Sequence, residues 1–254
     1  MAAGAVEVAV TSNNSKACAN FDGVDDVITA TNVFPNFSTV SYTISFWMKR
    51  NLIASGDIGD RETILASGNQ TNPYFFLNLR SSKFRFRYID AGEDKTEDNA
   101  TQEDSKWVQF TCVFDKPNSK IVQYKNGVYT GQKIVDSFED LNNANLRMGD
   151  SGGYYAGALS NVKVWNRVLT TDEIARDYAG TPIPNGLTNR WKLMDDYKDS
   201  VGTADGTNSG TYLSIQEDAI AAQIKADRVT ANDKYLIAGF NNGQIISTVI
   251  EEAP

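Results

Sequence analysis

The residue types that most often carry enzyme chemistry are scarce in this chain. Its 254 residues include no histidine and two cysteines, Cys18 and Cys112. The lack of imidazole excludes Ser-His-Asp and Cys-His nucleophiles and removes the commonest zinc ligand. We interpret the cysteines as buried free thiols, with a single disulfide bond as the alternative.

Carboxylates are the remaining groups with catalytic or metal-binding chemistry, and they are densest in the segment 89–105. This segment, IDAGEDKTEDNATQEDS, contains seven acids and one lysine. Cation binding is one interpretation. A solvated loop is the one we favour, because the acids lack the regular alternation and the glycine of a calcium-binding loop such as the EF-hand.

Strands must position most of these residues, because hydrophobic side chains recur at every second position. In KFRFRYI, Phe84, Phe86 and Tyr88 alternate with basic residues, and Asn126-Gly127 indicates a two-residue hairpin. Many antiparallel strands at this spacing predict an all-β sandwich of two sheets. The predicted strands are 16–22, 25–30, 41–50, 62–67, 74–80, 83–89, 106–115, 119–126, 145–149, 158–166 and 188–194.

One short helix is predicted inside GALSNVKVWNRVLTTDEIARDYAG, residues 157–180. Thr170 and Glu173 form a capping box, and Ile174 and Tyr178 share a face that can be buried. Gly180 is the expected stop. We expect this helix to close one end of the sandwich. A second capping box, from Ser214 to Glu217, predicts another short helix, which two strands near Asn242-Gly243 would follow.

The charge of the chain limits its partners. The formal net charge is −8, and no basic cluster would attract nucleic acid or an anionic membrane. No apolar run is long enough to span a bilayer. Residues 1–15 lack the basic and apolar regions of a signal peptide, so we expect no leader here.

The helix segment and the strand after it, GLTNRWKLMD, closely resemble the C-terminal part of laminin-G-like and pentraxin-like jelly rolls of the concanavalin A-like group. ACANFDGVDDVI, YTISFWMKR and WVQFTCVFDKPNSKIVQYKNGV resemble earlier strands of the family, so the likeness covers roughly 16–196. It implies an antiparallel jelly roll of two sheets with one short helix after the last long strand. The expected organisation is an N-terminal arm (1–15), a jelly roll (16–200) and a C-terminal extension (201–254) that docks on a neighbour or on the sandwich.

The catalytic motif of the enzymes in this family is not found in the predicted strands. Glucanase relatives carry Glu-x-Asp-x-(x-)Glu on one strand, which supplies a nucleophile and an acid. No predicted strand of this chain has that pattern, so we expect no enzymatic activity.

The resemblance also implies calcium, which some relatives hold as one structural ion. The matching positions here are Asp22, Gly23 and Asp25, with Asn161 in place of a carboxylate before the tryptophan of the late strand. Pentraxins hold two ions in a loop that is reduced here to GDSGGYYAG, where Asp150 alone remains. Turn formation by Asp22, Asp25 and Asp26 is the competing interpretation.

Two functions fit these features. The first is a structural protein of a virus particle, a bacteriophage head-decoration or fibre-like protein on the virion surface. It would contact sister subunits or a shell protein and adhere to host glycans. The family is normally extracellular and residues 1–15 lack an export signal, which suits release by lysis.

The alternative is a secreted or cell-surface carbohydrate-binding module. Its ligand-binding residues would be aromatic side chains that stack on sugar rings and an aspartate in the loop before the late strand. The alternative role of the aromatic residues is packing in the core or at an interface. The candidate ligand-binding residues are Tyr74, Phe75, Asp150, Tyr154 and Tyr155.

Overall fold

The structure is a computed structural model. It describes residues 16–51, 62–68, 74–80, 83–90, 93–101, 105–141, 144–149, 153–216, 236–241 and 244–249, with the backbone alone for 90, for 93–101 and from 236 onward. The chain divides into two compact units, Met1–Ala219 and Ile220–Pro254.

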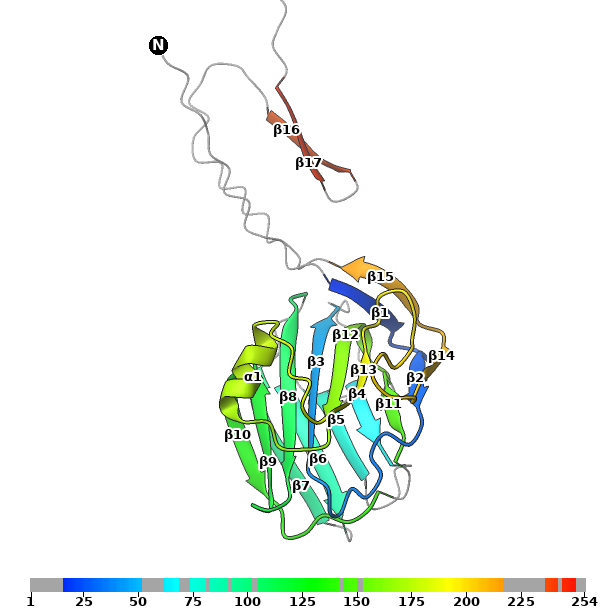
Figure 1. Ribbon diagram of the computed structural model, residues 1–254. Helices are drawn as coiled ribbons and strands as arrows, with labels where there is room; N and C mark the ends of the chain where they lie inside the picture. The colour runs from blue at the N-terminus through cyan, green and yellow to red at the C-terminus, as the bar shows by residue number, and fades with distance from the viewer. Residues whose placement is uncertain are drawn as a thin grey trace, which may run out of the picture. The chain divides into compact units, whose positions relative to one another are not determined.

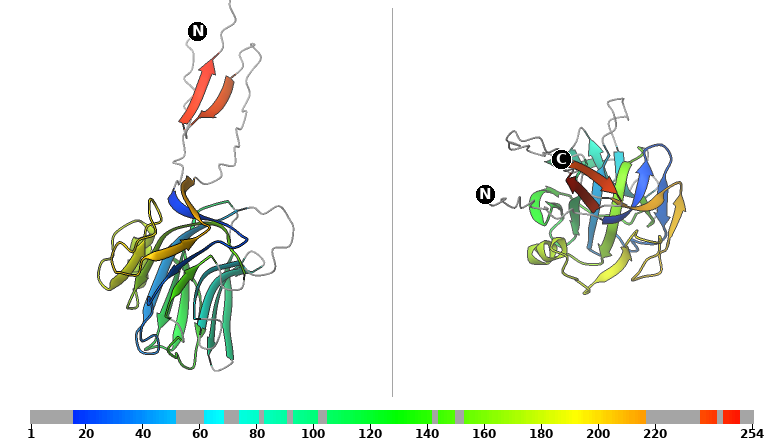
Figure 2. Two further views of the ribbon diagram at one scale, coloured as in Figure 1. Left: turned by 90° about the vertical axis from the view of Figure 1, so that its right-hand side faces the viewer. Right: turned by 90° about the horizontal axis from the view of Figure 1, so that it is seen from above.

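The first unit is a sandwich of two antiparallel sheets with one helix, which confirms the predicted jelly roll (Figures 1 and 2). Sheet A has the order β10-β9-β8-β3-β12-β1-β15, with β13 also paired to β12. Its strands are β1 (Lys16–Asp22), β3 (Tyr42–Arg50), β8 (Val108–Asp115), β9 (Lys120–Lys125), β10 (Val128–Ile134), β12 (Ala156–Trp165), β13 (Leu187–Trp191) and β15 (Tyr212–Gln216).

Sheet B has the order β14-β2-β11-β4-β5-β6-β7. Its strands are β2 (Val27–Ala30), β4 (Glu62–Ser67), β5 (Tyr74–Arg80), β6 (Lys83–Asp90), β7 (Glu93–Thr101), β11 (Leu146–Met148) and β14 (Gly206–Ser209).

The core lies between the sheets and is rich in phenylalanine. Alternation along β5 and β6 turns one face of each strand into it, as the sequence predicts. Phe84 and Phe110 stack with ring centroids 3.8 Å apart, which joins β6 of sheet B to β8 of sheet A. The largest fully buried core residues include Phe21, Phe34, Phe37, Phe46, Phe75, Phe84, Phe86, Phe110, Tyr88, Tyr155 and Trp191.

The acidic segment 89–105, interpreted above as a solvated loop, is in fact largely a strand. β7 is the edge strand of sheet B and pairs with β6 in a register that sets Asp98 opposite Arg85. Opposite charges across a strand pair are favourable, and charged residues suit an exposed sheet edge. Asp98 is the one acid of β7 that this register places opposite a basic residue of β6.

The helix α1 (Thr171–Tyr178) has the predicted capping box. The backbone N–H of Glu173 donates to Thr170 Oγ1 at 3.2 Å, and the N–H of Thr170 donates to Glu173 Oε2 at 2.9 Å. The position of α1 differs from the expectation, because it lies on the outer face of sheet A rather than at an end of the sandwich. Ile174 packs there with Val113, Val122, Tyr124 and Trp165 in a second hydrophobic cluster.

The sheets continue past residue 200, where the sequence predicted the jelly roll to end. β14 pairs with β2, and β15 pairs with β1 in the register Lys16↔Gln216. Ser214 thus lies in a strand where a helix start was predicted, because pairing with the β1 edge outweighs the local capping signal. The second unit contains the predicted strand pair as the hairpin β16 (Leu236–Asn241) and β17 (Gln244–Val249). No helix among the described residues is long and apolar enough to cross a membrane.

Candidate functional site

The turn between β1 and β2 gathers three carboxylates. Oxygen atoms of Asp22, Asp25 and Asp26 all lie within 4.8 Å of one another. Burial raises the pKa of Asp26, and the charges of Asp22 and Asp25 raise it further, against a hydrogen bond from the backbone of Asp22. The cluster thus has the oxygen donors and negative charge that a hard cation requires.

Two of these carboxylates also build the turn. Asp22 Oδ1 accepts from the N–H of Val24, and Asp26 Oδ2 accepts from the N–H of Asp22, both at 2.8 Å. Gly23 supplies the positive φ of 84° that the turn needs. Turn formation and cation binding therefore fit the same residues, and Asp25 has no described hydrogen bond in the turn.

Asn161 is not near this cluster, which corrects the ligand set implied by the resemblance. Asp22 pairs with Ala156 on β12, and Asn161 is five residues further along, about 17 Å at the usual rise per residue. Asn161 has a φ of 49°, and its Oδ1 accepts from Arg190 Nε at 2.8 Å. It occupies a kink at which β12 exchanges its neighbour β1 for β13, and asparagine tolerates this conformation.

The proposed aromatic platforms are not brought together. Tyr155 is fully buried, and its hydroxyl lies within hydrogen-bonding distance of the carbonyls of Lys49 and Ala158, so it cannot stack on a ligand. Phe75 is likewise in the core. Tyr154 is 39% exposed, but it is not next to Tyr74. The residue before it, Gly153, accepts a hydrogen bond from the N–H of Thr63. Thr63 is opposite Asn78 on β5, which is four residues along that strand from Tyr74. Tyr74 is half-buried against Phe76, and Asp150 lies outside the described residues.

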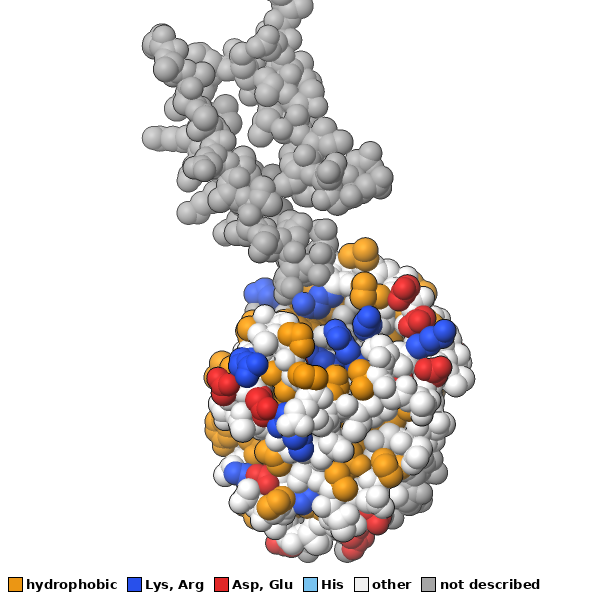
Figure 3. All heavy atoms as spheres, viewed as in Figure 1, with side chains coloured by type: hydrophobic (Ala, Val, Ile, Leu, Met, Phe, Trp, Pro, Cys, Tyr) orange, Lys and Arg blue, Asp and Glu red, His pale blue; other side chains and the backbone are white. Residues whose placement is uncertain are grey.

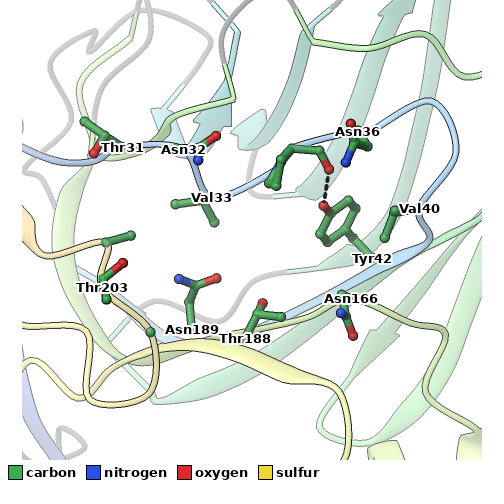
Figure 4. A pocket seen from close by; sticks show the side chains of 13 residues that line it. Thr31, Asn32, Val33, Asn36, Val40, Tyr42, Asn166, Thr188, Asn189 and Thr203 are labelled. Carbon is green, nitrogen blue, oxygen red and sulfur yellow. Dashed lines mark hydrogen bonds between the residues drawn. The ribbon is translucent and has the colours of Figure 1, made fainter.

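A hollow lined by amides and hydroxyls lies beside the loop after β2 (Figure 4). Its volume is about 490 Å³, in the usual range for a small-ligand pocket. Asn32 and Asn36 lie on one side, and Asn166 and Asn189 lie on the other. In the described part of the chain, the side-chain amides of Asn32, Asn36 and Asn166 have no hydrogen-bond partner. The other lining residues are Thr31, Val33, Pro35, Val40, Tyr42, Thr188, Gly202, Thr203 and Ala204. We call this hollow the amide pocket.

Hydrogen bonds fix the walls of the amide pocket. Tyr42 donates its hydroxyl to the carbonyl of Pro35 at 2.5 Å, which ties β3 to the loop above it (Figure 4). On the opposite wall, Asn189 Nδ2 donates to Asp199 Oδ2 at 2.6 Å. The backbone N–H groups of Arg190, Val201 and Gly202 donate to Asp199 Oδ1. Burial would raise the pKa of Asp199, but these donors outweigh it and lower the pKa.

A larger groove of about 690 Å³ runs over the outer face of sheet A beside α1. Aromatic and basic side chains line it, and Figure 3 shows basic side chains gathered on this face. Trp47 and Tyr178 stack with centroids 5.6 Å apart, and Lys16 Nζ lies 3.6 Å from the Trp47 ring centre. A hollow of about 200 Å³ shares Lys16, Trp47, Asn161 and Arg190 with the groove and adds Lys192 and Met194. We call the two together the basic groove.

A buried ion pair forms the floor of the basic groove. Lys163 Nζ on β12 donates to Asp177 Oδ1 on α1. Asp177 Oδ2 also accepts from Ser45 Oγ at 2.9 Å and from Gln109 Nε2 at 3.1 Å. Burial lowers the pKa of Lys163, and Asp177 opposes this shift. The carboxylate charge of Asp177 is therefore compensated within the protein.

The sequence analysis missed both hollows. The residues that line the amide pocket come from segments more than 100 residues apart in the sequence. Asparagine in a loop is also a common turn residue, so these positions gave no specific signal of a binding site. Lys163 and Arg190 alternate with core residues, a pattern typical of any solvent-facing strand surface. These residues line a groove only because α1 packs beside them on the outer face of sheet A.

Comparisons with known proteins agree on the fold. The model of the concanavalin A-like lectin/glucanases superfamily, a laminin G type, matches residues 22–175. A Bacteroides ovatus protein proposed to bind carbohydrate has a TM-score of 0.58 and 18% identity over 80% of this chain. The match spans 60% of that protein's length.

Two further solved structures are similar. A heptameric SAP-like pentraxin from Limulus polyphemus has a TM-score of 0.54 and 16% identity over 79% of this chain and 95% of its own. Domain 4 of an extracellular arabinanase from Geobacillus stearothermophilus, in complex with arabinotriose, has a TM-score of 0.51 and 15% identity. The match covers 64% of this chain and 76% of that domain's chain.

At these identities the solved structures establish the fold alone, and no curated protein matches the chain. The family model, however, covers more than half of the sequence, and the two-sheet jelly roll agrees with it. This chain therefore belongs to the concanavalin A-like lectin/glucanases superfamily.

Proposed function

We propose that this protein is a non-catalytic, lectin-like module that binds a neutral saccharide in the amide pocket. The observation that carries the proposal is that three exposed side-chain amides without a described hydrogen-bond partner, those of Asn32, Asn36 and Asn166, line one hollow. Each amide has both donors and an acceptor, as does each pair of sugar hydroxyls. No charged residue lines this pocket, which suits a neutral ligand.

The absence of catalysis is part of the proposal. The sequence has no histidine, and the pocket lining has no carboxylic acid that would protonate a glycosidic oxygen. The superfamily contains lectins as well as glucanases, and the similar Bacteroides ovatus protein is proposed to bind carbohydrate. We therefore expect binding without turnover.

A structural calcium ion is the cofactor we propose, held by Asp22, Asp25 and Asp26. When bound, it would neutralise the three carboxylates and fix the turn between β1 and β2. Asn161 is not part of this ligand set, as described above.

We place the module outside cells or on a cell surface, with glycans as partners. The arabinanase that carries a similar domain is extracellular, and the Bacteroides ovatus protein is proposed to bind carbohydrate. The similar proteins reported above are lectin-like or carbohydrate-binding rather than virion components. They thus favour this role over the virion-surface role, with its sister subunits or shell protein, that the sequence analysis placed first.

A direct test is to screen the full chain against neutral gluco-, manno-, galacto-, xylo- and arabino-oligosaccharides. Asn36→Ala and Asn166→Ala should each weaken binding about three- to tenfold, as expected for one lost hydrogen bond. Gln132→Ala is a matched amide control, because this side chain is exposed on the distant edge strand β10. No binding to any neutral glycan, or equal loss in all three variants, would contradict the proposal.

A further inference from the structure

The basic groove carries charge of the opposite sign to the chain as a whole. Four cations line it, and Asp177 is the one carboxylate among its described lining residues. The chain itself has a net charge of −8. The cations are Lys16, Lys163, Arg190 and Lys192.

The single carboxylate does not cancel this field. Asp177 is 5% exposed and is saturated by Lys163, Ser45 and Gln109, so the ion pair contributes little net charge to the groove. Arg190 on β13 is opposite Lys163 in the strand register and lines the groove with the ion pair, whereas Lys192, just after β13, is exposed and lines the adjoining hollow. Basic groups grouped in a concave surface focus the field on a bound anion.

The walls of the groove favour a ligand with flat, weakly polar faces. Trp47 and Tyr178 stack on one another, and Tyr178 is 39% exposed at the groove. Pro182, Pro184 and Leu187 continue the apolar wall. A sugar ring offers C–H faces to such a wall, while an attached carboxylate or sulfate projects from its edge toward the bases.

We propose that the basic groove is a second ligand site, separate from the amide pocket, which takes an acidic saccharide. Arg190 and Lys192 bind the acidic group, and the exposed ring of Tyr178, held by stacking on Trp47, supports the sugar ring. Lys16, whose Nζ lies over the Trp47 ring, adds a third positive charge. The site goes beyond the neutral-glycan function proposed above and uses different residues.

The ligands for the test are matched in shape and differ in charge. A uronic acid oligosaccharide is compared with the same oligosaccharide after reduction of its carboxyl groups to alcohols, and a sulfated oligosaccharide distinguishes sulfate from carboxylate recognition. Binding to the full chain is measured by calorimetry at low and at physiological salt. We expect the acidic form to bind at least tenfold more tightly than its reduced form, with weakening as salt rises.

Substitutions distinguish binding in the groove from nonspecific electrostatic attraction of an anion to the protein surface. Lys192→Gln should weaken binding of the acidic form about tenfold, the usual effect of removing one charge-assisted contact. Arg190→Gln should do the same, whereas Arg190→Lys retains the charge and should weaken binding less. Tyr178→Ala tests the aromatic wall. Lys133→Gln on β10 makes the same charge change away from the groove and should have no effect.

The outcomes also distinguish this proposal from the first one. Asn36→Ala and Asn166→Ala should leave acidic-glycan binding unchanged. If neutral glycans bind and the acidic form binds no better than its reduced form, the basic groove is not an acidic-saccharide site. Equal binding of polyglutamate would overturn the saccharide assignment, and equal effects of Lys133→Gln and Lys192→Gln would overturn the site.

Discussion

Lys116 places its ammonium group among aromatic rings of the core. Its Nζ lies 3.5 Å from the ring centre of Phe37 and 3.4 Å from that of Phe138, and it has no hydrogen-bond partner among the described residues. Burial lowers its pKa to about 6, and Asp140 opposes this shift. The ring faces stabilise the cation in part, but hydrogen bonds to water are lost.

Lys116→Met should therefore stabilise the protein, by roughly 1–3 kcal/mol at pH 7. A folded-state pKa of about 6 lies below the unfolded value of about 10.4, so the unfolded chain binds an extra proton between these values. The wild-type stability gains from this group as pH rises through that window. The advantage of the variant should be largest near pH 6 and below and should shrink toward pH 10.

Urea unfolding at several pH values measures this difference. Lys198→Met, which changes an exposed lysine in the loop after β13, is the control and should show little effect at any pH. A stability difference for Lys116→Met that does not change with pH would show that its amine is not desolvated.

Asp25 offers a selective test of the calcium proposal, because it has no described hydrogen bond in the turn. Calcium should raise the melting temperature of the wild type, since a ligand bound only by the folded state stabilises it, by about 2.7 kcal/mol at one hundred times Kd. Asp25→Asn should remove this rise and leave the calcium-free melting temperature nearly unchanged. A melting curve that is the same with calcium and with excess chelator would exclude a tightly held ion.

Several residue roles could not be read from the sequence. Tyr154 and Tyr155 are adjacent and chemically identical and lie just before β12, yet one is exposed and the other is fully buried. The turn role of Asp22 was predictable, since an aspartate before glycine is a local signal. The distance from Asp22 to Asn161 depends on strand register, which no local signal gives.

At the scale of elements, the Lys163–Asp177 pair fastens α1 to sheet A. Removing one partner leaves a buried charge, so Asp177→Asn or Lys163→Met alone should cost about 3–5 kcal/mol. The double variant should recover much of this loss, because the amide oxygen that replaces the carboxylate still accepts from Ser45 and Gln109 while no buried charge remains.

Equilibrium unfolding of the four proteins gives the coupling energy. Arg176→Gln, which breaks the exposed Arg176–Asp172 pair at 3.8 Å, should cost less than about 1 kcal/mol. Single-variant losses that simply add in the double variant would mean that the two residues do not act as a pair.

Most elements were predictable because their signals are local. The capping box set the start of α1, and Asn126-Gly127, with φ values of 51° and 77°, formed the predicted hairpin. β7 and β15 were missed for the opposite reason. Their strand state depends on a neighbour, β6 for one and β1 for the other, and the local composition favoured a loop and a helix.

For the whole molecule, the register of β15 moves the limit of the jelly roll to about Ala219. Asn20 Nδ2 donates to the carbonyl of Tyr212 at 3.0 Å, and Trp107 Nε1 donates to that of Gln216 at 2.9 Å. A truncated chain 1–219 should keep the melting temperature of the sandwich. A chain 1–210 should melt at a lower temperature and aggregate, because it exposes the edge of β1.

Circular dichroism melts and light scattering test this pair of truncations. Equal melting temperatures for 1–210 and 1–219 would show that β15 adds nothing to the stability of the sandwich. Loss of folding in 1–219 would show that the second unit is required.

The strand β13 borders both proposed sites. Thr188 and Asn189 line the amide pocket, whereas Leu187 and Arg190 line the basic groove. A polysaccharide with neutral and acidic stretches would meet the second site at high effective concentration once the first is occupied. Avidity of this kind raises affinity by a factor of about one hundred or more without any new contact. Such a mixed polymer should outcompete a mixture of its separate fragments, and the advantage should fall about tenfold in Lys192→Gln.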